Sequence, residues 1–108
     1  MRVAVVGALG RMGSEVVAEA LEDPDVSEVY GVDIREGPSP APLFKSLKDT
    51  PPVDAACEFA SPEATLENLR VAAERGIPYL VGTTGHPKGF LDEVRQYARR
   101  IPVLVAPN

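Results

Sequence analysis

The sequence has a single cysteine, one histidine and no apolar run long enough to cross a membrane as a helix. Cys57 has no partner for an internal disulfide, and its free thiol is typical of a reducing, cytoplasmic compartment. The chain begins directly in a strand-like run, so we expect neither a signal peptide nor a membrane span. Because no second thiol or histidine lies at metal-ligand spacing, we expect no metal site.

Basic charge is also in short supply. Lys and Arg number 11 against 16 Asp and Glu, which gives a net charge of -5. This balance argues against nucleic acid or an anionic membrane as the main partner. It does not exclude an anionic ligand, because the N-terminus of a helix or a nest of backbone N–H groups binds phosphate on an acidic protein. The length of 108 residues and the apolar content of 44% fit one globular domain spanning 1–108.

Short β-branched runs alternate with amphipathic segments along the whole chain. This alternation predicts an α/β fold, a Rossmann-type doubly wound parallel sheet of about five strands with helices on both faces. The segment 34–52 contains five of the eleven prolines, so we expect a loop there with one turn around 44–48. The strands are expected within 2–7, 28–33, 53–60, 78–85 and 101–108, and the helices within 12–22, 62–75 and 88–100.

The expected helices also have predicted buried faces and ends. Ser61 should cap the second helix through its hydroxyl, with Pro62 at the first helical position and Gly76 at the stop. The apolar positions that should face the core are Met12, Val16, Val17, Ala20 and Leu21 in the first helix, Leu66, Leu69 and Ala73 in the second, and Phe90, Leu91, Val94, Tyr97 and Ala98 in the third.

The stretch "GALGRMG" at 7–13 places three glycines between the first strand and the first helix. Gly7 permits the tight turn, Gly10 lets a pyrophosphate approach the backbone, and Gly13 lets the helix pack closely on the strand. The alternative is a plain strand-to-helix turn, since a glycine pattern alone is weak evidence. Met12 is either the first apolar residue of the helix or a flexible side chain that lines a pocket.

Asp33 strengthens the dinucleotide interpretation. It lies twenty residues beyond Gly13, at the end of the second expected strand, where an acid accepts hydrogen bonds from ribose hydroxyls. Arg11 and Arg35 are placed to pair with a 2′-phosphate, which favours NADP, whereas Asp33 would repel that group and favour NAD. We therefore expect tolerance of either cofactor. The alternatives are a non-binding strand end for Asp33 and solvated surface positions for the arginines.

The stretch "VGTTG" at 81–85 has two interpretations. Thr83 or Thr84 caps the third helix, or the small residues let a nicotinamide ring and its ribose lie against the backbone. We favour the second, because this strand end faces the glycine loop across the reversal of strand order. His86 is expected to be a solvated loop residue and Cys57 a small core residue. Glu58 and Glu63 flank the end of the third strand, with nothing that pairs them as an acid–base couple.

Four stretches occur together in one order: "RVAVVGALGRMG", "EFASPEATLENL", "YLVGTTG" and "VLVAPN". Across all 108 residues the chain resembles the N-terminal half of the dihydrodipicolinate reductase family, oxidoreductases of the diaminopimelate and lysine pathway. The resemblance implies NAD or NADP as cofactor. It assigns the pyrophosphate to Gly7, Ala8, Leu9, Gly10, Arg11 and Met12, the ribose and any 2′-phosphate to Asp33, Arg35 and Arg11, and the nicotinamide side to Gly82, Thr83, Thr84, Ala106, Pro107 and Asn108.

The family's catalytic block has no counterpart in these residues. That block is a His-His-x-x-Lys stretch followed by a Ser-Gly-Thr turn, in a second domain that binds the small dicarboxylate substrate and builds a tetramer. We therefore assign no catalytic residue, and we expect this chain to bind cofactor without turnover, as a monomer. Two alternatives remain: a stand-alone nucleotide- or CoA-binding module, and the cofactor domain of another amino-acid dehydrogenase.

Overall fold

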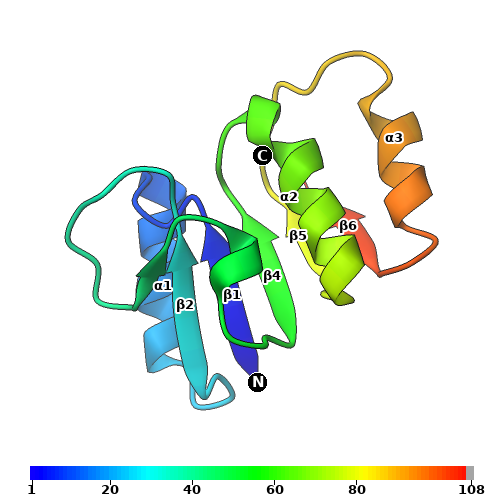
Figure 1. The fold of residues 1–108 in the computed structure, drawn as a ribbon. Coiled ribbons are helices and arrows are strands. Elements are labelled where there is room, and N and C mark those ends of the chain that lie inside the picture. The colour runs from blue at the N-terminus through cyan, green and yellow to red at the C-terminus, as the bar shows by residue number, and fades with distance from the viewer. Residues whose placement is uncertain (107–108) are drawn as a thin grey trace.

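A single parallel sheet forms the centre of the molecule (Figure 1). The computed structural model describes residues 1–106. Its six strands lie in the order β3-β2-β1-β4-β5-β6, so the order reverses at β1, as in a doubly wound fold. The strands are β1 (Arg2–Val6), β2 (Glu28–Val32), β3 (Leu43–Phe44), β4 (Ala55–Glu58), β5 (Tyr79–Val81) and β6 (Val103–Val105). The predicted Rossmann-type sheet is confirmed.

The sixth strand corrects the expectation of about five. β3 lies inside the proline-rich segment 34–52 and pairs with β2 at the sheet edge, with Gly31 opposite Leu43 and Val32 opposite Phe44. A short 3-10 helix, η1 (Leu47–Asp49), follows it. A strand of two residues beside prolines has no recognisable period of its own, and its pairing with β2 defines it.

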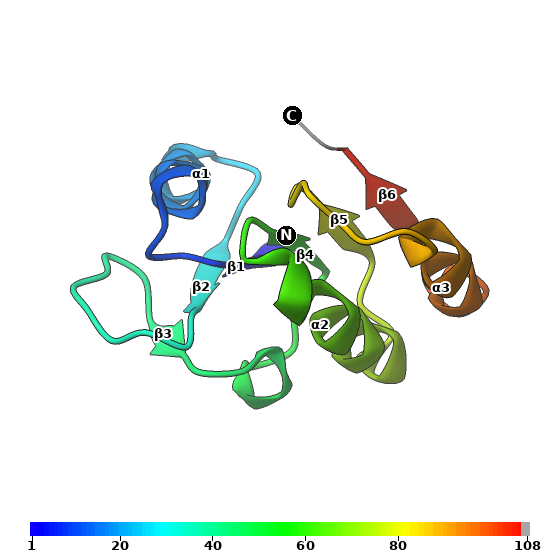
Figure 2. The same cartoon turned by 90° about the horizontal axis from the view of Figure 1, so that it is seen from above.

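Helices cover both faces of the sheet, as expected. Figure 2 shows α1 (Arg11–Glu22) on one face, with α2 (Pro62–Arg75) and α3 (Phe90–Tyr97) on the other. This division follows from right-handed crossovers that run in opposite directions from β1. Helix α3 is shorter at both ends than the expected range 88–100.

Helix α1 buries a narrower stripe than its sequence predicts. Gly13 and Val17 are its buried residues, whereas Met12 is 42% and Leu21 47% exposed. The expected core positions Met12 and Leu21 are therefore wrong. The cause is that α1 packs over β1 and β2, and only the side centred on Val17 contacts that part of the sheet.

Helix α3 also buries a narrower apolar stripe than its sequence predicts. Phe90 and Val94 are buried and Tyr97 packs against them, but Leu91 is 55% exposed. Ala98, the C-cap, is also exposed. Helix α3 lies beside α2 at the β6 end of the sheet (Figure 2), and only its side with Phe90 and Val94 faces the core.

Helix α2 begins and ends at the predicted residues, by partly different means. Pro62 occupies the first turn, but the Ser61 side chain makes no capping hydrogen bond, which corrects that prediction. Gly76 adopts the left-handed conformation at φ 68°, and its N–H donates to Ala72 O and Ala73 O. The fixed φ of proline starts the helix without help from the serine hydroxyl.

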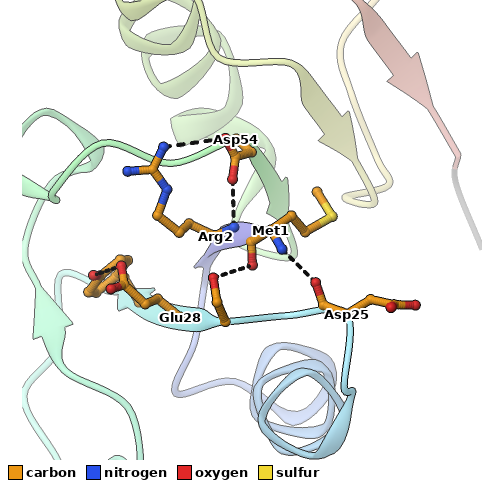
Figure 3. A network of polar contacts seen from close by, with 7 residues as sticks. Met1, Arg2, Asp25, Glu28 and Asp54 are labelled. Carbon is orange, nitrogen blue, oxygen red and sulfur yellow. Dashed lines mark hydrogen bonds and ion pairs between the residues drawn. The ribbon is translucent and has the colours of Figure 1, made fainter.

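The amino edge of the sheet is closed by its own polar groups (Figure 3). The Met1 ammonium donates to Asp25 O at 2.5 Å. The Arg2 N–H donates to Asp54 Oδ2 at 2.7 Å, and the Arg2 guanidinium pairs with Asp54 Oδ1 at 3.4 Å. These contacts hold the start of the chain against the loops before β2 and β4.

Candidate functional site

The opposite, carboxyl edge gathers the predicted site segments. Backbone hydrogen bonds join consecutive strand ends: Gly7 N–H to Val32 O at 2.8 Å, Phe59 N–H to Val6 O at 2.8 Å, Gly82 N–H to Glu58 O at 2.9 Å and Ala106 N–H to Val81 O at 2.8 Å. All strands end at this edge, away from the N-terminus (Figure 1). The segments after β1, β2, β4, β5 and β6 therefore lie side by side along one line.

Two glycines of the loop between β1 and α1 are required by space. Gly7 has φ +84°, and a Cβ there would lie 2.7 Å from the carbonyl carbon of Phe59. A Cβ at Gly13 would lie 1.9 Å from Gly7 O, so any side chain would push α1 away from the turn. The predicted roles in turn formation and helix packing have direct support in these distances.

Gly10 is the N-cap of α1 and, unlike Gly7 and Gly13, has room for a side chain. A Cβ at Gly10 would lie 3.4 Å from Gly7 O, so its lack of a side chain is not required by packing. Among the described residues no side chain caps this helix end. The first-turn N–H groups, those of Arg11, Met12 and Gly13, have no acceptor within the helix. Arg11 and Met12 are exposed, so a small anion has access to a helix end that carries partial positive charge.

Asp33 lies immediately beside this loop. Its carboxylate is buried and accepts from the Leu9 N–H at 3.0 Å and from the Arg35 N–H at 3.0 Å. The Arg35 guanidinium adds Nε to Oδ1 and Nη2 to Oδ2, both at 3.1 Å. Burial raises the pKa of Asp33, but the hydrogen bonds from Arg35 and Leu9 outweigh it and hold the pKa below its ordinary value. Asp33 is thus an ionised acceptor.

Arg35 is exposed over most of its side chain, with 61% of the side-chain surface accessible. One guanidinium nitrogen lies 3.6 Å from the position of a Cβ on Gly10. The charge of Arg35 is therefore next to the open helix end. Ala8, by contrast, is only 3% exposed and its N–H donates to Val32 O, so this predicted pyrophosphate residue presents neither its side chain nor its N–H at the loop surface.

A pocket of about 360 Å³ opens between these groups and helix α2. Asp33 and Arg35 lie on one side of it, and Asn68 of α2 on the other. Its lining is Val6, Gly7, Val32, Asp33, Ile34, Arg35, Lys45, Phe59, Ala60, Ser61, Ala64 and Asn68. A largely apolar concavity with a few polar groups at its rim suits a flat heterocycle attached to a hydroxylated, charged group.

The loop after β5 contains Gly82, Thr83 and Thr84. A Cβ at Gly82 would lie 2.5 Å from a ring carbon of Phe59, so this position has no room for a side chain. Thr83 is buried and Thr84 is exposed. The alternative in which either threonine caps α3 is wrong, because α3 begins at Phe90 with Gly89 as its N-cap.

The polar group that sequence analysis left without a role is Glu58. Its side chain is 0% exposed, and its carboxylate accepts from Thr65, Asn68, Tyr79 and Thr83. Burial and the charge and hydrogen bond of Glu58 raise the pKa of Tyr79 well above its ordinary value. The sequence does contain a signal of this buried group. Glu58 is an acid inside the otherwise apolar strand "AACEFA", and an acid in such a strand indicates buried hydrogen-bond partners.

His86 is not the solvated residue that the sequence predicts. Its ring stacks on Phe90 with centroids 3.7 Å apart, and its Nε2 lies 2.7 Å from Thr83 O. Its Nδ1 is buried without a partner. The packing of the loop before α3 against that helix accounts for the difference.

Cys57 is half-buried on the face covered by α1, and burial raises the pKa of its thiol to about 11. Within residues 1–106 no group of three His, Cys, Asp or Glu side chains could hold a metal ion. No helix in that range is long and apolar enough to span a membrane. Of the predicted site residues after β6, Ala106 is exposed, and Pro107 and Asn108 lie outside the described residues.

Comparisons with known proteins place this arrangement in a family. A family model described as dihydrodipicolinate reductase, N-terminus, matches residues 1–108. The 4-hydroxy-tetrahydrodipicolinate reductase of Rubrobacter xylanophilus is 38% identical over 120 residues, and that of Natronomonas pharaonis is 42% identical over 112; each match covers 100% of this chain and 45% of the relative. The chain thus spans about half the length of the curated relatives it matches.

A solved structure shows the same fold. The dipicolinate-bound dihydrodipicolinate reductase from Paenisporosarcina sp. TG-14 superposes with a TM-score of 0.86 at 23% identity, over 100% of this chain and 47% of that protein. The family model and the structural match both extend over the entire chain. The chain belongs to the dihydrodipicolinate reductase family, of which it represents the N-terminal domain.

Proposed function

We propose that this chain is the NADH- or NADPH-binding domain of a 4-hydroxy-tetrahydrodipicolinate reductase, an enzyme of diaminopimelate and lysine biosynthesis. The observation that carries the proposal is the carboxyl edge of the sheet. There an uncapped helix end, an ionised Asp33 and a pocket of about 360 Å³ adjoin one another. Family membership supplies the identity of the enzyme.

The residues present fit a dinucleotide. The loop 7–12 would hold the pyrophosphate, since Gly10 leaves the helix end open. The pocket would take the adenosine, with Asp33 at its ribose, and the loop 82–84 would border the nicotinamide together with 106–108. Bound NADH or NADPH supplies a hydride to the substrate. The small dicarboxylate substrate and any tetramer would require the part of the relatives that extends beyond this match, so the chain alone binds cofactor without turnover.

Either cofactor fits the groups beside the pocket. Asp33 would accept from ribose hydroxyls, which suits NADH, and Arg35 has an exposed guanidinium for a 2′-phosphate, which suits NADPH. Because Arg35 neutralises Asp33, the acid does not present a bare negative charge to the phosphate. Dual use follows from this pairing.

Titration calorimetry of the chain with NADH, NADPH and coenzyme A tests the proposal. We expect one saturable site for NADH and for NADPH, with coenzyme A at least about tenfold weaker. Preferential binding of coenzyme A would favour a nucleotide-binding module of the same fold. Absence of binding by both dinucleotides would contradict the proposed function.

A further inference from the structure

The buried carboxylate of Glu58 joins four parts of the domain. Its Oε2 accepts from Thr65 of α2 at 2.5 Å and from Thr83 of the loop after β5 at 2.9 Å. Its Oε1 accepts from Tyr79 of β5 at 2.7 Å and from Asn68 of α2 at 3.3 Å. Glu58 itself ends β4 and is 0% exposed, so it cannot touch a ligand.

In each of these contacts Glu58 accepts the hydrogen bond and its partner donates. The four donors are hydroxyl or amide groups and none is a cation. A buried carboxylate held only by neutral donors relies on their hydrogen bonds to offset its loss of hydration. Glu58 therefore constrains the positions of the donor side chains that reach it.

Thr83 is the donor that lies in a loop. Its hydroxyl is directed to Glu58, with Ala60 O as a second acceptor at 3.3 Å, and its carbonyl oxygen lies 2.7 Å from Nε2 of His86. Both polar ends of Thr83 thus bind the protein interior, while the next residue, Thr84, is exposed. Hydrogen bonds of Thr83 therefore fix the loop 82–84 on its interior side, while Thr84 leaves its outer side exposed.

The other donors are held by regular structure. Thr65 and Asn68 belong to α2, and Tyr79 belongs to β5, so backbone hydrogen bonds keep them in position without Glu58. Thr83 has no helix or strand of its own. Loss of the carboxylate should therefore move the loop more than it moves the pocket, although Asn68 lines that pocket.

We propose that Glu58 is a positioning residue for the nicotinamide half of the cofactor, which it orients through Thr83 and the loop 82–84. This inference rests on the proposed function, because the loop needs a ligand to position. The adenosine half, bound by the pocket and the loop 7–12, is linked to Glu58 only through Asn68, which helix α2 holds in place. A residue that only stabilised the fold would affect both halves alike.

The test compares NADH with ADP-ribose, which lacks the nicotinamide, for the wild-type chain and Glu58→Gln. We expect Glu58→Gln to weaken NADH binding by about tenfold and to leave ADP-ribose binding within about twofold. The matched control is Thr65→Val, which removes a donor to the same carboxylate oxygen from helix α2. It should lower the unfolding midpoint and leave the affinity ratio of NADH to ADP-ribose unchanged.

A second pair of variants carries the test if Glu58→Gln does not fold. Thr83→Val removes the hydroxyl that reaches Glu58 and should reduce the same ratio, and Thr83→Ser restores a hydroxyl and should recover it. An unchanged ratio in Glu58→Gln, or in Thr83→Val where that variant decides, would overturn the inference while wild-type NADH binding stood. Failure of the wild-type chain to bind NADH would instead remove the proposed function.

Discussion

Arg35 and Asp33 form the charged pair on which cofactor preference should depend. Replacing Arg35 by Ala removes the guanidinium available to a 2′-phosphate and one hydrogen bond to each Asp33 oxygen, while the backbone N–H groups of residues 9 and 35 still donate to them. We expect NADPH affinity to fall by about tenfold or more, because a charge-assisted contact is lost and Asp33, without its cationic partner, then faces the phosphate. NADH affinity should be unchanged or higher. Parallel titrations with both cofactors measure the change in preference.

A suitable control is Arg95→Ala, which removes an exposed arginine that pairs with Asp92 on α3, away from the pocket. Its preference should equal that of the wild type. Equal losses of NADH and NADPH affinity in Arg35→Ala would show that Arg35 supports the fold of the loop and does not distinguish the cofactors.

Asp33 also links stability to pH. Its pKa is lower in the folded chain than in the unfolded one, so its contribution is present above the unfolded value and is lost as pH falls through the folded value. We expect Asp33→Asn to be less stable than wild type at pH 7, with the difference closing below about pH 4. Urea unfolding at several pH values checks this. A difference that persisted unchanged into acid would show that the charge is not responsible.

At the scale of the element, two glycines of the loop between β1 and α1 have different roles: Gly13 is required by packing, and Gly10 by the proposed ligand. A methyl group at Gly13 would lie 1.9 Å from Gly7 O, so Gly13→Ala should lose about 3 kcal/mol of unfolding free energy or fail to fold. Gly10→Ala has room and a φ of -78°, and should lose about 1 kcal/mol or less.

Gly10→Ala, the variant with the smaller loss of stability, should show a large loss of NADH affinity. Gly10→Ala places a methyl group at the proposed pyrophosphate site beside α1, so we expect it to fold and to bind NADH about tenfold more weakly or worse. Urea unfolding and NADH titration of both variants measure the two effects. Full NADH affinity in a folded Gly10→Ala would contradict a phosphate site at this helix end.

Elements that the sequence predicts well are those defined by period and by end signals. Helix α2 has Pro62 at its start and Gly76 at its end, and it was placed correctly even though Ser61 does not cap it. β3 was missed because two residues between prolines carry no period, and only pairing with β2 makes them a strand. The exposed face of α1, including Met12, depends on how much of the sheet the helix covers, which no local pattern contains.

The candidate site likewise contains residues that the sequence predicts and residues that it does not. The glycine loop and Asp33 follow from spacing, because strand ends in a parallel sheet share one edge. Glu58 and His86 do not, because their surroundings come from residues distant in the chain: Tyr79 and Thr83 for the acid, Phe90 for the histidine ring. A lone acid in an apolar strand is the one local sign that such a network exists.

At the scale of the whole molecule, the two edges of the sheet have different tasks. The amino edge is occupied by its own contacts, Arg2 with Asp54 and the Met1 ammonium with Asp25 O (Figure 3). The carboxyl edge presents the open end of α1, the pocket and the loop 82–84 in a line. We propose from this polarity that one dinucleotide lies along the carboxyl edge, and that the reaction partners are supplied by the part of the relatives outside the matched half.

The most direct test is a map of backbone amide chemical shifts in the ¹⁵N-labelled chain during titration with NADH. We predict saturable shifts that concentrate at 7–12, 33–35 and 82–84, with the amides of Arg2, Asp25 and Asp54 at the amino edge unmoved. Titration with ADP-ribose should move the first two groups and spare 82–84. Absence of saturable shifts, or shifts concentrated at the amino edge, would contradict the account.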